Sequence, residues 1–262
     1  MDLKEYYLVK CFTTEKYRDD FNNGVDIHIN NNRQFWKKEN AFQQDLEGVV
    51  LKQNGDGFLF RPKKGCEIEI EKIIVGYSGK SLKNLSEKLE HYGSIVGSTT
   101  DFTMSVDGYI CCSYLLRKKD IKIDVENGSL VFFDNKIKDD FSKFLDEYAS
   151  ENKKHDGKCY VSIYDAYEFM LVFSQGFKSK GYSIKYGIVS YSDVTLEKKI
   201  EALNNSDYKT IIFTKPTKYS YQNEFRIFLQ KKDDVLKDYL SESGIEMKLG
   251  SVASFEYYLN EN

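Results

Sequence analysis

The chain has 262 residues, of which 41% are hydrophobic and 15% are aromatic. That apolar share suffices for a packed core and excludes wholesale disorder. The formal net charge is −3, which excludes a global positive field that would draw the chain to nucleic acid or to an anionic membrane. Only 2 prolines accompany 20 tyrosines and 18 phenylalanines, a balance that favours sheet and long continuous elements.

The cysteine pattern and the N-terminus predict the compartment. The five cysteines show no metal-ligand spacing and are odd in number, so we expect reduced thiols without a bound metal. The chain begins with acidic and polar residues, and no apolar run approaches the roughly 18 residues that a membrane span needs. These features predict a soluble cytoplasmic protein with no membrane partner. The cysteines are Cys11, Cys66, Cys111, Cys112 and Cys159.

Strand and helix signals alternate at the N-terminus. Residues 6–12 predict a first strand that carries Lys10, because six of the seven residues suit a β-surface. Thr13 or Thr14 then caps a short helix. Gly24 follows two asparagines and ends that helix in a left-handed conformation.

Residues 25–29 and 49–75 predict further strands, the second range with an internal hairpin. Between them lie two neighbouring acids, Asp45 and Glu47, followed by Gly48. They form either a loop that caps a helix and turns at the glycine or acids at the rim of a cleft. No histidine or third carboxylate stands nearby at ligand spacing, so we do not expect a metal there.

Residues 109–116 form the most apolar predicted strand of the first half, so we place this strand centrally, with Ser113 as its one hydroxyl. No linker or composition break divides the chain. We therefore predict a single α+β domain over 1–262, with a mixed, mainly antiparallel sheet split around a cleft and flanked by helices. The later predicted elements are an amphipathic helix over 137–149, a strand over 158–163, a helix over 164–175, a strand pair over 182–191, a helix over 235–241 and a last strand over 251–259.

The stretch 215–229 opens with a turn at Pro216 and then alternates with the period of a strand. One face is mostly apolar, and the other carries a polar row. Burying that row without partners would cost roughly 2–7 kcal/mol per polar group, so the row faces either water or a polar cleft. It is an exposed strand face with a Glu224–Arg226 pair, or a cleft strand whose glutamate does chemistry. The mostly apolar face holds Tyr221, Asn223, Phe225, Ile227 and Leu229, and the other face holds the polar row of Gln222, Glu224 and Arg226, followed by Phe228.

Gln222-x-Glu224 on a late strand, flanked by aromatic residues, resembles the Gln/Glu-x-Glu signature of ADP-ribosyltransferases. The N-terminal order of strand, helix, glycine and strand is also similar to the opening of many of these enzymes. The resemblance implies NAD as a substrate. Glu224 would hold the ribose 2′-hydroxyl and stabilise the oxocarbenium-like centre as nicotinamide leaves, and Gln222 would orient the acceptor.

The same resemblance implies further NAD-pocket residues: Lys10, Thr13, Ser113 and Tyr221. Lys10 stands where the family usually has Arg or His, and it offers a point charge without the arginine fork. Ser113 is either the hydroxyl of the family's middle motif or a satisfied core hydroxyl. The implied acceptor is RNA or protein of the same cell, as for the toxin of a toxin–antitoxin or phage-defence system, with an antitoxin protein as a possible partner.

Two other function classes compete with the transferase. A non-catalytic module that binds a nucleotide or RNA would use the aromatics and lysines interleaved over 215–221 to stack bases. A nuclease would need a clustered acid set with a lysine, for which Asp45, Glu47 and Lys52 are available.

Overall fold

The computed structural model describes most of the chain outside residues 32–48, 54–92 and 231–246. Asp45, Glu47, Cys66, most of the predicted strands over 49–75 and the predicted helix over 235–241 lie outside the described residues. The described residues are 1–24, 29–31, 49–53, 93–97, 102–106, 109–124, 129–151, 157–193, 198, 202, 207–230, 247, 249–250 and 252–258.

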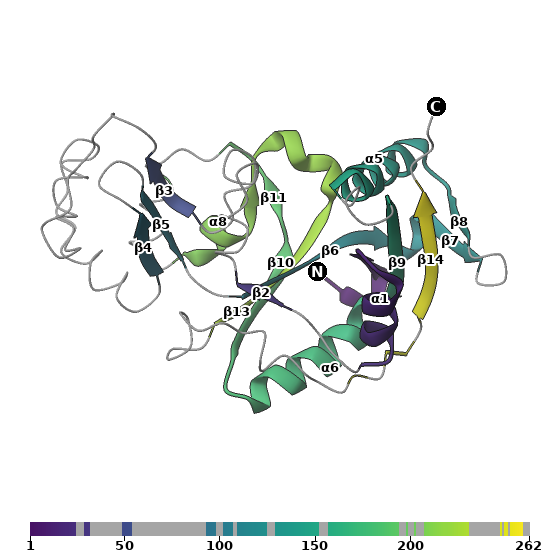
Figure 1. Ribbon diagram of the computed structural model, residues 1–262, viewed down its shortest axis with the longest axis horizontal. Coiled ribbons are helices and arrows are strands. Elements are labelled where there is room, and N and C mark those ends of the chain that lie inside the picture. Colours follow the sequence, from purple (N-terminus) through teal and green to yellow (C-terminus); the bar gives the residue numbers. More distant parts are fainter. Residues whose placement is uncertain are drawn as a thin grey trace, which may run out of the picture.

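A seven-stranded sheet organises the fold (Figure 1). Its main path runs β10-β13-β6-β1-β9-β14, with β2 paired to β6 off this path, and all of these neighbours are antiparallel. The predicted central place of the strand over 109–116 is confirmed. The strands are β1 (Tyr6–Phe12), β2 (Asn30–Asn31), β6 (Tyr109–Arg117), β9 (Lys158–Asp165), β10 (Ser183–Ile188), β13 (Glu224–Gln230) and β14 (Val252–Tyr258).

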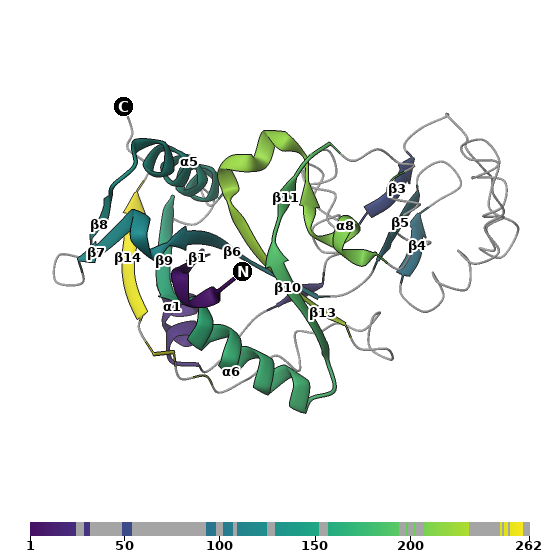
Figure 2. The ribbon, with the colours of Figure 1, turned by 180° about the vertical axis from the view of Figure 1, so that it is seen from behind.

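Three smaller sheets accompany it. The antiparallel sheet β3-β5-β4 lies apart from the seven-stranded sheet, at the end away from β14 (Figures 1 and 2). A β7–β8 hairpin extends the other end, and β11–β12 is the parallel pair of the described strands. The strands are β3 (Val49–Gln53), β4 (Gly93–Gly97), β5 (Phe102–Val106), β7 (Ile121–Asp124), β8 (Ser129–Phe132), β11 (Ser190–Tyr191) and β12 (Thr214–Lys215).

Two long helices, α5 and α6, cover opposite faces of the seven-stranded sheet (Figures 1 and 2). Each packs its own apolar cluster, with Phe141 of α5 in one and Phe169 of α6 in the other. No helix of the described part of the chain is long and apolar enough to cross a membrane. The helices are α1 (Glu15–Asn22), α5 (Asn135–Glu151), α6 (Ala166–Ser179) and α8 (Tyr208–Ile212), with 3-10 turns η1 (Leu3–Glu5), η3 (Lys118–Asp120) and η4 (Thr217–Gln222).

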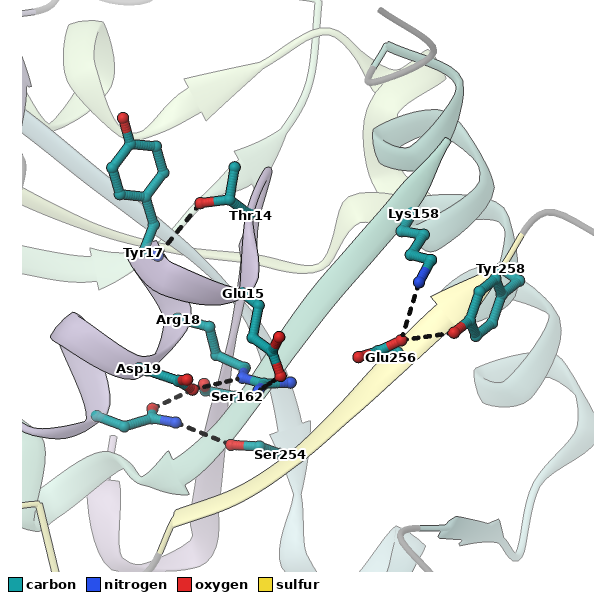
Figure 3. A network of polar contacts seen from close by, with 11 residues as sticks. Thr14, Glu15, Tyr17, Arg18, Asp19, Lys158, Ser162, Ser254, Glu256 and Tyr258 are labelled. Atoms are coloured by element: carbon teal, nitrogen blue, oxygen red, sulfur yellow. Dashed lines mark hydrogen bonds and ion pairs between the residues drawn. The ribbon is translucent and has the colours of Figure 1, made fainter. Parts of the chain in front are cut away.

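The N-terminal predictions are confirmed where the structure describes them. β1 spans the predicted 6–12, and the Thr14 hydroxyl caps α1 by accepting a 3.2 Å hydrogen bond from the backbone N–H of Tyr17 (Figure 3). Gly24 has φ +69, and a Cβ there would lie 2.0 Å from the Met247 carbonyl oxygen. Of the predicted strand over 25–29 only Ile29 is described, and it precedes β2.

β1 and β6 pair along only part of their lengths. Their register runs from Tyr6–Arg117 to Val9–Tyr114. Beyond that point β1 continues to Phe12 beside β9, whereas β6 runs back to Tyr109 beside β13. The two strands therefore take different partners from Tyr114 onward.

The coarse fold prediction is confirmed: the chain combines helices with a mainly antiparallel sheet. That the fold is ADP-ribosyltransferase-like, with a cleft, stays a prediction. The boundary between the strand predicted over 158–163 and the helix predicted over 164–175 was wrong, because the strand continues to Asp165 and the helix spans Ala166–Ser179. The Asp165 carboxylate accepts from the N–H groups of Tyr167 and Glu168, which makes it the N-cap of α6 and delays the helix.

Candidate functional site

The stretch 215–229 is not one alternating strand. After Pro216 the chain makes the 3-10 turn η4, and regular pairing begins only at Glu224. Asn223 between them has φ +35, a left-handed conformation that asparagine tolerates better than most residues. Its side-chain amide donates to the Leu115 carbonyl at 2.5 Å, and the Leu115 N–H donates back to the Asn223 carbonyl at 2.9 Å. This pair fixes the start of β13 against β6.

Two residues of the polar row, Glu224 and Arg226, are buried, and Gln222 is half-buried. Glu224 is 5% exposed, and Arg226 is 0% exposed, so the interpretation as a solvent-exposed face was wrong, although the Glu224–Arg226 pair exists. One carboxylate oxygen accepts from Arg226 Nε at 2.7 Å, and the other accepts from Lys215 Nζ at 2.8 Å. Lys215 also donates to Gln222 Oε1 at 2.8 Å. We call Lys215, Gln222, Glu224 and Arg226 the Glu224 cluster.

Backbone groups and a tyrosine complete the surroundings of the Glu224 cluster. Arg226 also donates to the Ile212 carbonyl at the end of α8. The Glu224 N–H donates to the Tyr191 hydroxyl at 2.8 Å. Because these charged groups have polar partners, the sheet accommodates them despite the cost of desolvation.

The charges of the cluster keep Glu224 ionised. Burial opposes ionisation, but the positive charges of Arg226 and then Lys215 outweigh it and hold the pKa of the Glu224 carboxyl well below its usual range. Burial, reinforced by the Glu224 charge, raises the pKa of the Tyr191 hydroxyl, so this tyrosine stays protonated. The site therefore offers a fixed carboxylate rather than a carboxylic acid.

Helix α5 contributes a second carboxylate next to the cluster. Glu147 Oε2 accepts from the Tyr221 hydroxyl at 2.5 Å and from Gln222 Nε2 at 3.2 Å. Lys143, one turn earlier, places Nζ 3.9 Å from the centroid of the Tyr221 ring. Burial and the bond to Glu147 raise the pKa of the Tyr221 hydroxyl.

Lys10 and Ser113 lie on the other face of the sheet from the Glu224 carboxylate. In the register of β13 with β6, Glu224 pairs with Tyr114 and Phe225 pairs with Ser113. Paired residues of antiparallel strands share a face and successive residues alternate. Tyr114 packs on Phe141 of α5, whereas Phe225 belongs to the α6 cluster. Val9 pairs with Tyr114, so Lys10, the next residue, shares the α6 face with Ser113.

These two residues bond to β6 and to the core. Lys10 Nζ donates to the Cys112 carbonyl at 3.0 Å and lies 3.3 Å from Cys111 Sγ, where β1 no longer pairs with β6. The Ser113 hydroxyl shares a 3.0 Å hydrogen bond with Tyr164, which matches the core-hydroxyl alternative. Thr13 follows β1 directly and precedes the cap of α1.

The structure thus brings together Gln222, Glu224 and Tyr221 and separates them by the sheet from Lys10 and Ser113. Lys215 and Glu147 were not among the predicted site residues. Lys215 reaches Glu224 because the chain makes a 3-10 turn between them. The alternating strand pattern predicted over 215–229 gave no sign of that turn. Glu147 lies on the helix predicted over 137–149, whose apolar residues indicated only that the helix packs on the sheet. No local sequence signal links it to residues 74 and 75 positions away.

The four described cysteines form no disulfide with one another, and within the described ranges no three His, Cys, Asp or Glu side chains gather in a way that could hold a metal ion. The groups available for a ligand at the cluster are therefore carboxylates, an amide, a phenol and ammonium or guanidinium groups. Searches against family models, curated proteins and solved structures returned no match to this chain.

Proposed function

We propose that the chain is an NAD-dependent ADP-ribosyltransferase in which Glu224 is the catalytic carboxylate. The observation that supports this most is a carboxylate that is ionised at neutral pH and bonded to two cations, at the first residue of β13. A preorganised negative charge of this kind stabilises a positively charged transition state without reorganising during the reaction. The three strands that carry Glu224, Ser113 and Lys10 also lie side by side in the sheet, in the order β13-β6-β1.

In the proposed reaction, nicotinamide leaves the ribose C1′ of NAD with the electron pair of the glycosidic bond. An acceptor nucleophile attacks C1′ and loses its proton. Glu224 stabilises the positive charge that develops on the ribose and accepts a hydrogen bond from its 2′-hydroxyl. A carboxylate has about four lone-pair sites, and Lys215, Arg226 and the Cys112 thiol each use one, so one acceptor site remains for a hydroxyl.

Gln222 is proposed to orient the acceptor, an RNA or a protein of the same cell, and Tyr221 lies beside it. We assign a different role to Lys10 and Ser113, which face α6: they tie β6 to β1 and to β9 through the Cys112 carbonyl and the Tyr164 hydroxyl. The toxin role and an antitoxin partner remain part of the proposal.

The test is nicotinamide release from NAD. Glu224→Gln should lower the rate about a hundred- to a thousandfold, the typical effect of losing one such electrostatic group. Because Gln leaves two buried cations less well compensated, Glu224→Asp is the second variant: it keeps the charge, withdraws it by one methylene and should still lose most of the rate. Glu256→Gln, on the surface of β14, is the control and should match the wild type. A wild type that releases no nicotinamide refutes the proposal.

One observation favours the alternative, a non-catalytic module that binds a nucleotide or RNA: both oxygens of Glu224 already bind internal cations. A binder should retain most of its affinity for NAD or RNA in Glu224→Asp, whereas an enzyme should lose its rate. Calorimetric titration of both variants with NAD, beside the release assay, separates the two.

A further inference from the structure

Glu147 joins helix α5 to the turn that precedes the catalytic strand. It accepts from the Tyr221 hydroxyl at 2.5 Å and from Gln222 Nε2 at 3.2 Å, both through the same oxygen, Oε2. Tyr221 is held from a second side by Lys143, whose Nζ lies 3.9 Å from the ring centroid. Lys143 and Glu147 are four residues apart, so they project from the same side of α5. One face of α5 therefore contacts both Tyr221 and Gln222, the two residues that precede Asn223.

The contacts of Gln222 fix which way its amide points. Its oxygen accepts from the Lys215 ammonium at 2.8 Å, and its nitrogen donates to the Glu147 carboxylate. The reversed amide would place NH2 against an ammonium and oxygen against a carboxylate, so only one orientation satisfies both neighbours. Without Glu147 the nitrogen end would lose the partner that enforces this choice.

A continuous chain of polar contacts results. It runs from Glu224 through Lys215 and Gln222 to Glu147, and each hydrogen bond in it is 3.2 Å long or shorter. Two carboxylates, one on β13 and one on α5, thus hold the ammonium and the amide between them. The second N–H of the amide faces the Tyr221 oxygen, and one lone pair of the amide oxygen is not used by these bonds.

We propose that Glu147 is a positioning residue for the acceptor: it holds Gln222, and with it Tyr221, in the orientation that presents the remaining lone pair of the amide oxygen to the nucleophile. This inference rests on the proposed function, in which Gln222 orients the acceptor. A side chain that orients a reactant must itself be fixed, since small misplacements cost large factors in rate. Glu147 has no bond to Glu224, so cleavage of NAD does not depend on it in the same way.

The experiment measures two products of one reaction mixture. NAD labelled in its adenosine half is incubated with bacterial cell extract, and label in the protein and RNA fractions is compared with free nicotinamide. Glu147→Gln should lower labelled acceptor per nicotinamide released about tenfold, a moderate share of the roughly hundredfold that a misplacement of about 1 Å can cause. Nicotinamide release itself should stay within about twofold of wild type, which a general loss of structure would not allow.

Two further variants sharpen the result. Glu147→Asp keeps the charge but retracts it, so its product ratio should fall between those of Glu147→Gln and wild type. Asp139→Asn removes an exposed carboxylate from the same helix and should keep the wild-type ratio. An unchanged ratio in Glu147→Gln, or an equal fall of both products, overturns the inference alone. A wild type that releases nicotinamide but labels no acceptor also overturns it, and a wild type that releases none overturns the proposed function and the inference together.

Discussion

Two polar assemblies of this protein use the same kinds of side chain in different surroundings. In the Glu224 cluster, Arg226 is 0% exposed and bonds to Glu224 at 2.7 Å. On α1, Arg18 bonds to Glu15 and to Asp19 at 3.0 Å each, but those carboxylates are 58% and 51% exposed (Figure 3). The bond lengths are nearly equal. What differs is the medium around the charges.

The comparison shows that the distance between two charges does not by itself determine how much an ion pair contributes to the free energy of unfolding. Water screens the α1 pairs and competes for their hydrogen bonds, so each contributes roughly 0–1 kcal/mol. The Glu224 cluster has given up hydration, so each charge depends on its protein partners. The buried cluster is therefore costly to disturb, and the surface network is tolerant. Four measurements can break or refine this contrast.

The largest effect is expected from Arg226→Met, which keeps an unbranched apolar stem but removes the buried guanidinium. Glu224 then keeps only Lys215 as a cationic partner, and the Ile212 carbonyl loses its donor. Breaking a buried pair in this way typically costs about 3–5 kcal/mol of unfolding free energy. Arg18→Met is the matched control and should cost less than about 1 kcal/mol. Urea unfolding of both variants gives the values, and equal losses would contradict the contrast.

The second effect is a dependence on pH. The pKa of Glu224 is lowered in the folded state from an unfolded value of about 4.3. The resulting stabilisation is fully present above about pH 4.3 and is lost as the pH falls from there toward the lowered pKa. Glu224→Gln should therefore flatten the decline of unfolding free energy between about pH 5 and pH 3. An unchanged slope in Glu224→Gln would show that Glu224 is not the group responsible.

The sequence predicted the regular elements well and the buried cluster poorly. Strand 6–12, the Thr14 cap and the central strand around Ser113 follow from local signals, namely β-rich composition, a capping hydroxyl and an apolar run. Glu224 and Arg226 were correctly paired. Their burial was missed because α5, α8 and η4 close over that face of the sheet, and these elements come from elsewhere in the chain.

The contacts of Lys215, Lys10 and Ser113 could not be predicted from local sequence patterns either. Lys215 meets Glu224 because Asn223 adopts a left-handed conformation, and a period-of-two pattern carries no sign of that reversal. The side of the sheet on which Lys10 and Ser113 lie depends on strand register, which pairs residues more than 100 positions apart. Such facts belong to the tertiary fold rather than to any local pattern.

A smaller effect is expected where α1 meets the sheet. The Ser162 hydroxyl is buried and donates to Asn22 Oδ1 at 2.8 Å, and Asn22 Nδ2 donates to the exposed Ser254 hydroxyl at 2.9 Å. Ser162→Ala leaves the Asn22 oxygen without this donor and should cost about 1–3 kcal/mol. Ser254→Ala should cost much less, because water can replace its hydroxyl. Thermal unfolding of the pair measures the difference, and equal costs would mean that burial does not set the strength of these bonds.

The smallest effect is expected at Tyr219, a tyrosine of η4 that is 6% exposed and lies beside Lys215, whose Nζ is 5.6 Å from its ring centroid. Among the residues that the structure describes, its hydroxyl has no hydrogen-bond partner. Tyr219→Phe removes a desolvated hydroxyl and keeps the ring, so the unfolding free energy should stay within about 0.5 kcal/mol of wild type or rise. Tyr164→Phe is the matched comparison, because it breaks the 3.0 Å bond to Ser113 and should cost about 0.5–1.5 kcal/mol. Urea unfolding decides between them. If Tyr219→Phe loses as much as Tyr164→Phe, the Tyr219 hydroxyl has a partner in solution, and burial rather than pairing would govern the energetics around the Glu224 cluster.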